Sequence, residues 1–302
     1  MARVGAVDMG TNSTRLLVAD VEGADIGEIE RLLRITRLGD RVDADGRLSD
    51  AAMGRVHGVL EGYAARAREL GAERVLATAT SAVRDAANGR EFLEEVELRH
   101  GFETRLLSGR EEAELTYRGV TSRLAAGSGT LVCDIGGGST ELVLGGPDGV
   151  DDAVSLDIGC VRMSERCLRS DPPGDDEIAA LRDAVAALLP HAITSRASML
   201  VGVAGTVTTL ATIDRGLDRE IPEEIDGHRL APDTVEGLLG RLAALPLAER
   251  REVRGLMPER APTIVAGAAI ASEVLRATGA GEMVVSERDI LHGAALLAAE
   301  QT

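Results

Sequence analysis

The stretch Asp8-Met9-Gly10-Thr11-Asn12-Ser13-Thr14 returns in altered form as Asp134-Ile135-Gly136-Gly137-Gly138-Ser139-Thr140, about 126 residues later. Each copy lies between two short apolar runs, so each is predicted to be the turn of a β-hairpin. A second pair of motifs has the same spacing: Ala77-Thr78-Ala79-Thr80 and Val203-Ala204-Gly205-Thr206. Two independent motifs with one spacing predict a chain built from two related lobes.

The length and composition of the chain agree with two folded domains. It has 302 residues, of which 44% are hydrophobic and 27% charged, and both fractions are typical of globular proteins. Strand and helix patterns alternate to the end, which predicts α/β layers. The small-residue stretch 125–129 is the predicted linker, so we expect an N-terminal lobe over 1–124 and a C-terminal lobe over 125–287.

The charge balance excludes several classes of function. The chain has 50 acidic residues against 33 basic ones and a formal charge of −17, so we expect neither nucleic acid nor an acidic membrane as a partner. Every basic residue is Arg, and there is no Lys. The absence of Lys excludes a Walker-type phosphate loop and a Schiff-base mechanism.

The three cysteines and the N-terminus give no sign of a zinc site or of export. Cys133, Cys160 and Cys167 lack the close pairing of zinc ligands, and Cys133 falls in an apolar strand pattern, which predicts a small buried thiol. The N-terminus leads directly into a strand pattern without a signal-peptide core. No apolar run approaches the ~20 residues that span a bilayer. We therefore expect a cytoplasmic protein.

Local patterns predict the element boundaries. The apolar run 32–38 is predicted to be a third strand of the first lobe. Ser49 is predicted to open a helix that Gly71 ends, and Ser108 with Glu111 has the spacing of a capping box at the start of another. The final helix is expected from about residue 288.

The repeated turns are the candidate phosphate sites. Glycines let backbone N–H groups converge on an anion, and the hydroxyl and amide side chains add donors. The strand-end aspartates Asp8 and Asp134 suit Mg²⁺ or Mn²⁺ beside a phosphate. The candidate phosphate-binding residues in the turns are Gly10, Thr11, Asn12, Ser13, Gly136, Gly137, Gly138, Ser139 and Thr140.

Two further side chains are candidates, and each has an ordinary structural alternative. Glu112 is not needed for the capping box that Glu111 explains, so it is a candidate general base for a water molecule. Acidic residues also favour a helix N-terminus without any catalytic role, and the spacing leaves both interpretations open. Arg84 follows the 80–81 turn and could neutralise phosphate oxygens, although a lone Arg is also typical of a solvated surface.

The motifs together resemble the exopolyphosphatase and guanosine-pentaphosphate phosphohydrolase (Ppx/GppA) family, within the actin, sugar-kinase and Hsp70 superfamily. The resemblance covers nearly the whole chain, and its matching blocks are 7–13, 79–84, 107–113, 134–141, 156–159, 202–206 and 286–293. The blocks Glu111-Glu112-Ala113 and 136–141 are specific to this family, whereas the superfamily requires only the two aspartate turns.

The resemblance implies two ribonuclease-H-like lobes with an interlobe cleft, and a closing segment 288–302 that packs back on the first lobe. It makes Glu112 the base that activates the attacking water. Asp134 and Glu141 would hold Mg²⁺ or the water, with Asp8 assisting. Arg84 and both turns would bind phosphates, and the turn at 205–206 would correspond to a nucleoside-binding position.

The resemblance leaves the substrate open. Longer members of the family have additional helical domains that this chain lacks, so the leading expectation is release of terminal phosphate from short inorganic polyphosphate. The nearest alternative is hydrolysis of guanosine pentaphosphate, which would need a base pocket near residues 205–209. A small-molecule kinase and a non-catalytic sensor are further alternatives. A homodimer is expected only by analogy.

Overall fold

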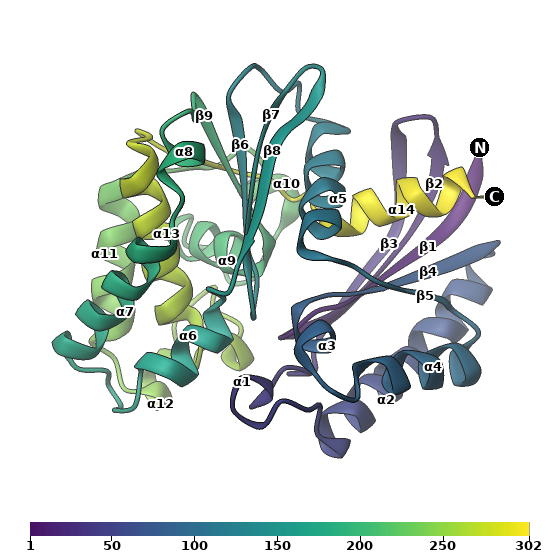
Figure 1. Cartoon of the computed structure of the whole chain (residues 1–302), viewed down its shortest axis with the longest axis horizontal. Coiled ribbons are helices and arrows are strands. Elements are labelled where there is room, and N and C mark those ends of the chain that lie inside the picture. Colours follow the sequence, from purple (N-terminus) through teal and green to yellow (C-terminus); the bar gives the residue numbers. More distant parts are fainter. Residues whose placement is uncertain (302) are drawn as a thin grey trace. The chain divides into compact units, whose positions relative to one another are not determined.

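A computed structural model describes residues 1–301 of the chain. The chain divides into two compact units, one formed by Met1–Ala125 with the chain from Arg288 onward, the other by Ala126–Glu287. We call them the N-terminal unit and the C-terminal unit. Each unit has helices around one sheet (Figure 1), which confirms the predicted α/β class.

The elements of the N-terminal unit are, in chain order, β1 (Ala2–Met9), β2 (Ser13–Glu22), β3 (Asp25–Ile35), α1 (Val42–Asp45), α2 (Asp50–Glu69), β4 (Arg74–Ala79), α3 (Ser81–Asp85), α4 (Gly89–His100), β5 (Glu103–Leu106), α5 (Gly109–Thr121) and α14 (Ile290–Glu300).

The elements of the C-terminal unit are, in chain order, β6 (Thr130–Ile135), β7 (Thr140–Gly146), β8 (Gly149–Leu156), α6 (Cys160–Cys167), α7 (Asp175–Leu188), α8 (His191–Thr194), β9 (Met199–Val203), α9 (Ala204–Asp214), α10 (Pro222–Ile225), β10 (Arg229–Leu230), α11 (Pro232–Ala243), α12 (Leu247–Arg250), a 3₁₀ turn (Pro258–Arg260), α13 (Ile264–Thr278) and β11 (Met283–Val285).

The two sheets have the same topology. The N-terminal order is β3-β2-β1-β4-β5, and the C-terminal sheet contains β8-β7-β6-β9-β11 with β10 added at its edge. In each, three antiparallel strands are followed by two strands parallel to the first. This correspondence confirms the two related lobes that the repeated turns predicted, and it agrees with the ribonuclease-H-like fold that the resemblance implies.

The predicted element ends are mostly confirmed, with one strand misplaced. Ser49 caps α2 by accepting a hydrogen bond from the Ala52 amide, and the Ser108–Glu111 capping box is present at α5. The strand predicted over 32–38 is β3, which begins at Asp25 and ends at Ile35. Its first half is polar and largely exposed, because β3 is an edge strand, and a search for apolar runs misses such a segment.

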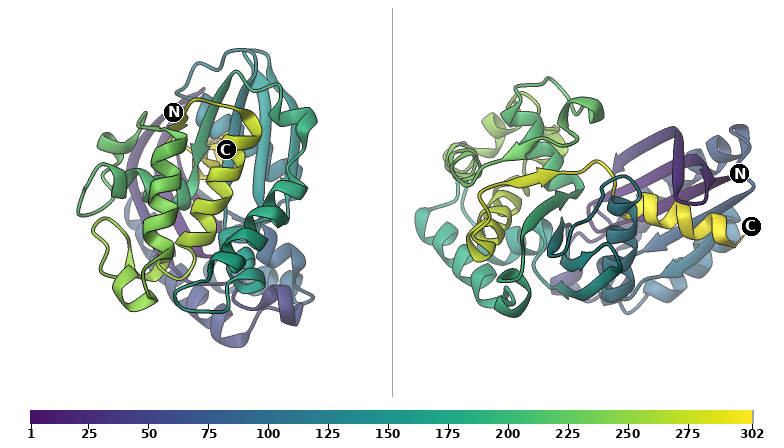
Figure 2. Two further views of the ribbon diagram at one scale, coloured as in Figure 1. Left: turned by 90° about the vertical axis from the view of Figure 1, so that its left-hand side faces the viewer. Right: turned by 90° about the horizontal axis from the view of Figure 1, so that it is seen from above.

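Both faces of the N-terminal sheet are covered. Val7 and Leu16 lie in a buried cluster with Leu60 of α2 and Phe92 of α4. On the other face, a buried cluster joins β1 and β2 to α14, with Leu291 among its members. The final helix therefore completes the core of the N-terminal unit (Figure 2).

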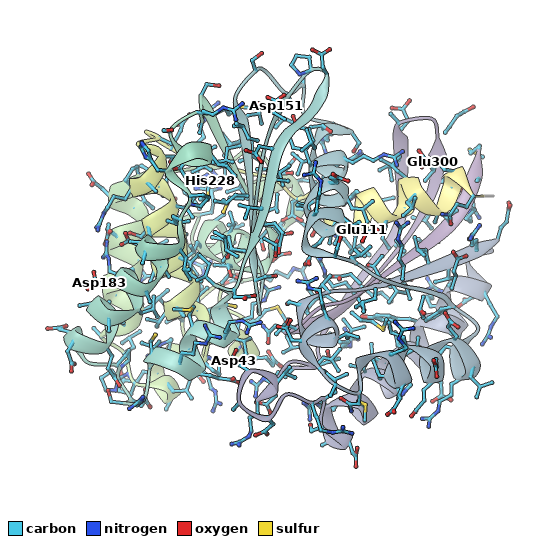
Figure 3. All side chains as sticks on the ribbon, in the orientation of Figure 1. Asp43, Glu111, Asp151, Asp183, His228 and Glu300 are labelled. Carbon is cyan, nitrogen blue, oxygen red and sulfur yellow. The ribbon has the colours of Figure 1, made fainter. Side chains whose placement is uncertain are left out.

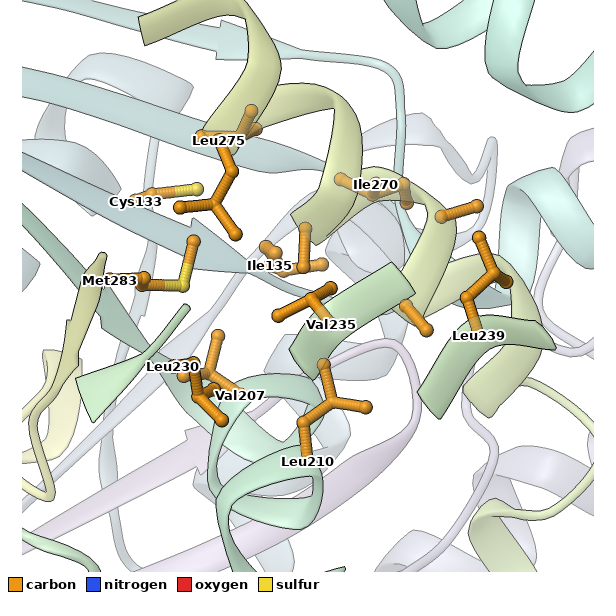
Figure 4. Packing of buried hydrophobic residues seen from close by; sticks show 14 of the residues in the cluster. Cys133, Ile135, Val207, Leu210, Leu230, Val235, Leu239, Ile270, Leu275 and Met283 are labelled. Carbon is orange, nitrogen blue, oxygen red and sulfur yellow. The ribbon is translucent and has the colours of Figure 1, made fainter. Parts of the chain in front are cut away.

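The C-terminal core is aliphatic. Cys133 and Ile135 of β6 lie in one buried cluster with Ile270 and Leu275 of α13 (Figure 4). Burial raises the pKa of the Cys133 thiol well above its usual value, and the nearby carboxylates Asp134 and Glu141 raise it further. The predicted small buried thiol is thus confirmed.

The acidic excess lies at the surface. The carboxylates of Asp43, Asp151 and Asp183 are exposed (Figure 3), where water solvates them and the cost of charge burial does not arise. Within residues 1–301, no helix combines the length and the apolar character needed to cross a membrane.

Two glycines bring α5 and α14 into close contact. A Cβ added at Gly119 of α5 would lie 1.9 Å from the Asp289 carbonyl oxygen, and one added at Gly293 of α14 would lie 2.0 Å from the Leu115 carbonyl oxygen. The backbones touch where any larger residue would clash. This contact fixes α14 against the helix that carries Glu112.

A buried charge network continues from the start of α14. Arg15 of β2 forms ion pairs with Asp8 and with Asp289, the N-cap of α14. His292 lies 3.6 Å from Asp289 (Nδ1 to Oδ1) and 3.1 Å from Glu28 (Nε2 to Oε1). Burial lowers the pKa of His292, but these two carboxylates raise it more, so its pKa lies above its ordinary value.

We predict that Gly293→Ala destabilises the protein by about 2–3 kcal/mol, because the added methyl group overpacks a backbone contact. The control is Gly62→Ala in α2, where nothing lies within 4 Å of the added Cβ. It should gain up to ~1 kcal/mol from higher helix propensity. Urea unfolding measures both, and equal stability of the two variants would contradict the packing argument.

We also predict that His292→Gln loses about 1–2 kcal/mol of stability at pH 6 and much less at pH 9. A group whose pKa is raised on folding stabilises fully below its unfolded pKa, and this contribution is lost as pH rises through the folded pKa. Gln keeps a capping-box side chain at this position. Unfolding at both pH values is the measurement, with exposed His191→Gln as control, and a deficit that grows with pH would reverse the sign we expect.

Candidate active site

Three parallel strands of the N-terminal sheet end at one edge, and the predicted site residues follow them. Met9 of β1 pairs with Ala79 of β4, and Ala79 pairs with Leu106 of β5. The chain then enters the 10–13 turn after β1, α3 after β4 and α5 after β5. Ligand sites in α/β sheets lie at the carboxyl ends of parallel strands.

The turn after β1 is held by its own backbone and by α3. The Gly10 amide donates to the Ser13 carbonyl at 3.0 Å, so this amide closes the turn, and a phosphate-binding role of Gly10 stays a prediction that rests on close approach to its backbone. The hydroxyls of Thr11 and Ser81 lie 2.9 Å apart. The Asn12 carbonyl accepts from the Thr36 amide at 3.1 Å. The candidate phosphate turn is therefore fixed to the start of α3.

The structure brings Arg84 and Glu112 together. Arg84 Nη1 donates to the Leu107 carbonyl at 2.8 Å and to Glu112 Oε2 at 3.2 Å. Glu112 is buried in the first turn of α5, and the capping box beside it uses Glu111. Arg84 is thus not a lone surface cation, because it orients the candidate base.

Asp8 has a cationic partner on the neighbouring strand. The register pairs Asp8 directly with Arg15, and Arg15 Nη2 lies 2.8 Å from Asp8 Oδ2. Burial raises the pKa of Asp8, and it outweighs the lowering by Arg15. The other oxygen, Oδ1, is buried and has no hydrogen-bond partner within residues 1–301. Asp8 is therefore largely neutralised by the protein itself, with one oxygen left for a further ligand.

The glycine turn of the C-terminal unit is closed by the same kind of backbone hydrogen bond as the turn after β1. The Gly136 amide donates to the Ser139 carbonyl at 3.0 Å, as Gly10 does to Ser13. Thr140 then donates its hydroxyl hydrogen to the Ile158 carbonyl, so this hydroxyl is used in packing β7 against the segment after β8. The amides of Gly137, Gly138 and Ser139 remain the donors best suited to an anion.

The residue opposite the strand-end aspartate differs between the two units. Asp134 faces Glu141 across β6 and β7, where Asp8 faces Arg15. Both carboxylates are buried, and Ser155 Oγ donates to Glu141 Oε1 at 2.6 Å. Opposed residues of an antiparallel pair lie on one face at close range, and two like charges there are destabilising. A hard divalent cation fits such a pair of oxygen ligands.

The predicted metal set is only partly assembled by the geometry. In the part of the chain that the structure describes, no three His, Cys, Asp or Glu side chains gather as a metal site. Asp134 and Glu141 belong to the C-terminal unit and Asp8 to the N-terminal unit. The metal-binding set of Asp8, Asp134 and Glu141 thus stays a prediction. The structure shows only that Asp134 and Glu141 are opposed on neighbouring strands.

The expected turn at residues 205–206 is the start of a helix. α9 begins at Ala204, whose φ of 68° is left-handed. The guanidinium of Arg260 covers Gly205 so closely that a Cβ there would lie 1.7 Å from Nη1. Arg260 is buried and donates to Thr209 Oγ1 at 3.3 Å. Arg260 therefore packs against the segment 205–209, where a base pocket for a nucleoside was expected.

Sequence reasoning missed three participants: Arg15, Ser155 and Arg260. Arg15 and Glu141 are separated by the same spacing as the two turns, so comparing the repeats one position beyond Thr14 and Thr140 reveals an Arg in place of a Glu. Ser155 and Arg260 contact the site through strand pairing and tertiary packing, and no local pattern marks them.

Comparison with known proteins agrees with the geometry. Residues 17–299 match the Ppx/GppA phosphatase family. Exopolyphosphatase 2 of Mycobacterium tuberculosis (strain CDC 1551 / Oshkosh) is 38% identical over 314 aligned positions, covering 98% of this chain and 98% of that protein. A solved Ppx/GppA family member from Aquifex aeolicus is 29% identical with a TM-score of 0.83, covering 99% of this chain and 98% of that one. An exopolyphosphatase from Cytophaga hutchinsonii is 27% identical with a TM-score of 0.88, covering 96% of each chain. With its duplicated aspartate turns and matches that span nearly its whole length, this chain belongs to the Ppx/GppA phosphatase family.

Proposed function

We propose that this chain is an exopolyphosphatase that releases the terminal phosphate of short inorganic polyphosphate by attack of water. The observation that carries the proposal is the glycine turn at 136–139, which lies at the end of a strand pair bearing the opposed carboxylates Asp134 and Glu141. Amide donors suit phosphate oxygens, and paired carboxylates suit a hard cation. The relatives named exopolyphosphatase support the substrate class.

The proposed cation is Mg²⁺ or Mn²⁺, held by Asp134 and Glu141. When bound, such an ion neutralises charge on the phosphate oxygens, which is a large part of catalysis in phosphoryl transfer. It would also remove the repulsion between the two carboxylates. Asp8, with Oδ1 unengaged among the described residues, is proposed as the assisting carboxylate of the N-terminal unit.

Glu112 is proposed as the general base. Its carboxylate takes a proton from the water whose oxygen attacks the terminal phosphorus. The bridging P–O bond then breaks, and the shortened chain leaves with the electron pair. Arg84, which donates to Glu112 at 3.2 Å, orients the base. A guanidinium with several N–H groups is also suited to a phosphate oxygen of the substrate.

The turn amides are proposed to hold the phosphate groups. In the C-terminal unit Gly137, Gly138 and Ser139 would donate from the backbone, and in the N-terminal unit the 11–13 segment would do so. Local amide donors and a cation explain how a protein with a net charge of −17 binds a polyanion, since its overall field is repulsive. The protein's overall electrostatic field therefore does not attract the substrate. The affinity for polyphosphate must come from contacts at the site itself.

Inorganic polyphosphate is favoured over guanosine pentaphosphate by the packing at α9. A nucleoside needs a pocket for its base, and residues 205–209 were its predicted position. In the structure Thr206, Thr208 and Thr209 are buried, and Arg260 lies directly on Gly205. Gly205 itself is only partly buried, but the Arg260 guanidinium fills the side of it on which a Cβ would lie, and this packing supports a substrate without a base.

We predict that, with Mg²⁺, the purified protein releases phosphate from short polyphosphate faster than from long polyphosphate or guanosine pentaphosphate. Glu112→Gln should lower the rate about 10²–10⁴-fold, because the amide cannot accept the proton of water. The control is Glu114→Gln on the same helix, an exposed residue paired with Arg110, which should retain the wild-type rate.

Two results would contradict the proposal. An undiminished rate in Glu112→Gln would remove the general base from the account. Absence of phosphate release from every polyphosphate, combined with phosphate transfer from ATP to a small acceptor, would favour a kinase. Faster release from guanosine pentaphosphate than from polyphosphate would instead reverse the substrate assignment.

A further inference from the structure

The glycine turn of the C-terminal unit is capped by the helix that follows β8. The first amides of a helix have no partner within the helix, and those of α6 are satisfied by the turn. The Cys160 amide donates to the Gly136 carbonyl at 2.9 Å, and the Val161 amide donates to the Gly137 carbonyl at 2.8 Å. The turn and the helix therefore fix each other.

The close approach requires a glycine before the helix. A Cβ at Gly159 would lie 2.3 Å from the Gly137 carbonyl oxygen and 2.5 Å from the Gly138 carbonyl carbon. Any side chain would push the helix start away from the turn. This contact thus explains the glycine that ends the 156–159 block.

A side chain extends the same arrangement to the third carbonyl. Arg162 Nε donates to the Gly138 carbonyl oxygen at 2.6 Å. The Arg162 side chain is 10% exposed, with Nη2 3.9 Å from Asp157 Oδ1. The carbonyls of Gly136, Gly137 and Gly138 are thus all bound by the first turn of α6.

Binding the carbonyls determines where the amides point. In a trans peptide the C=O and the following N–H point in opposite directions. Holding the carbonyls of Gly136, Gly137 and Gly138 toward α6 therefore turns the next three amides away from it, and the last of these belongs to Ser139. None of the three amides donates to a backbone carbonyl within the described residues. Successive amides of this kind form an anion-binding nest.

The N-terminal turn lacks the arginine. Its Thr11 carbonyl accepts from the Gly39 amide at 2.8 Å, and its Asn12 carbonyl accepts from the amides of Thr36 and Arg37. There too the segment after the third strand holds the turn, through the backbone amides of Thr36, Arg37 and Gly39. In the C-terminal turn the Arg162 side chain holds one of the carbonyls, so a point substitution there removes one anchor.

We infer that Arg162 is a positioning residue, which aims the Ser139 amide at the bound phosphate by holding the Gly138 carbonyl away from it. The inference rests on the proposed function insofar as the turn binds phosphate. Without the Arg162 hydrogen bond the 138–139 peptide can rotate, so that a carbonyl oxygen replaces an N–H donor beside the anion.

The test uses two variants of equal length. In Arg162→Gln the amide nitrogen is as many bonds from Cα as Nε is, so a donor remains, whereas Arg162→Met places a methyl group there. Calorimetry with Mg²⁺ and inorganic phosphate gives the Kd of each intact variant. We expect the Kd of Arg162→Gln for phosphate to stay within about twofold of the wild-type value. Arg162→Met should bind phosphate about tenfold more weakly, because the loss of a hydrogen bond from a charged group costs about that much.

The control is Arg166→Met, one turn further along α6 and exposed, which should bind phosphate as wild type does. Equal Kd values for Arg162→Met and this control would overturn the inference. Equal weakening by Gln and Met would also overturn it, because charge and not the hydrogen bond would then be responsible. Absence of phosphate binding by wild type would overturn it as well. If wild type binds phosphate but releases none from polyphosphate, the proposed function fails while the Kd comparison still decides the inference.

Discussion

The hydrogen bond from the Gly10 amide to the Ser13 carbonyl, and its counterpart from Gly136 to Ser139, closes a turn that sets the register of the strands on either side. That register decides which residue faces the strand-end aspartate. In the N-terminal unit an arginine faces it, and in the C-terminal unit a glutamate does. One aspartate is thus paired with an arginine of the protein, while the other lies opposite a second carboxylate, an arrangement that suits the cation we propose.

Because both units have the same topology, features that the units share can be assigned to the fold, and features that differ can be assigned to the candidate site. Parallel strands bring loop starts to one sheet edge, and the segment after the third strand anchors the carbonyls of each turn. These features are shared and structural. The activity we propose depends instead on what differs between the units: a second carboxylate in one, and Glu112 with Arg84 in the other. Function arises at sites built on a common fold.

The fold was predictable because it depends on local patterns that repeat. The turns, the capping box of α5 and the helix that ends at Gly71 follow from residue types and spacing. The polar half of β3 did not follow, since an edge strand need not be apolar. At the site, the resemblance to a family singled out Glu112, whereas its contact with Arg84 and the cover of Gly205 by Arg260 join residues far apart in the chain. Such contacts leave no local signal.

We propose that Asp134 and Glu141 would hold a divalent cation that offsets their mutual repulsion, and the thermal midpoint with and without Mg²⁺ tests this most directly. Wild type should gain several degrees in saturating Mg²⁺, because a ligand that binds only the folded state stabilises it. Glu141→Gln should be more stable than wild type without Mg²⁺ and should gain almost nothing from it. A wild type that does not respond to Mg²⁺, or a variant that gains as much as wild type, would contradict the account.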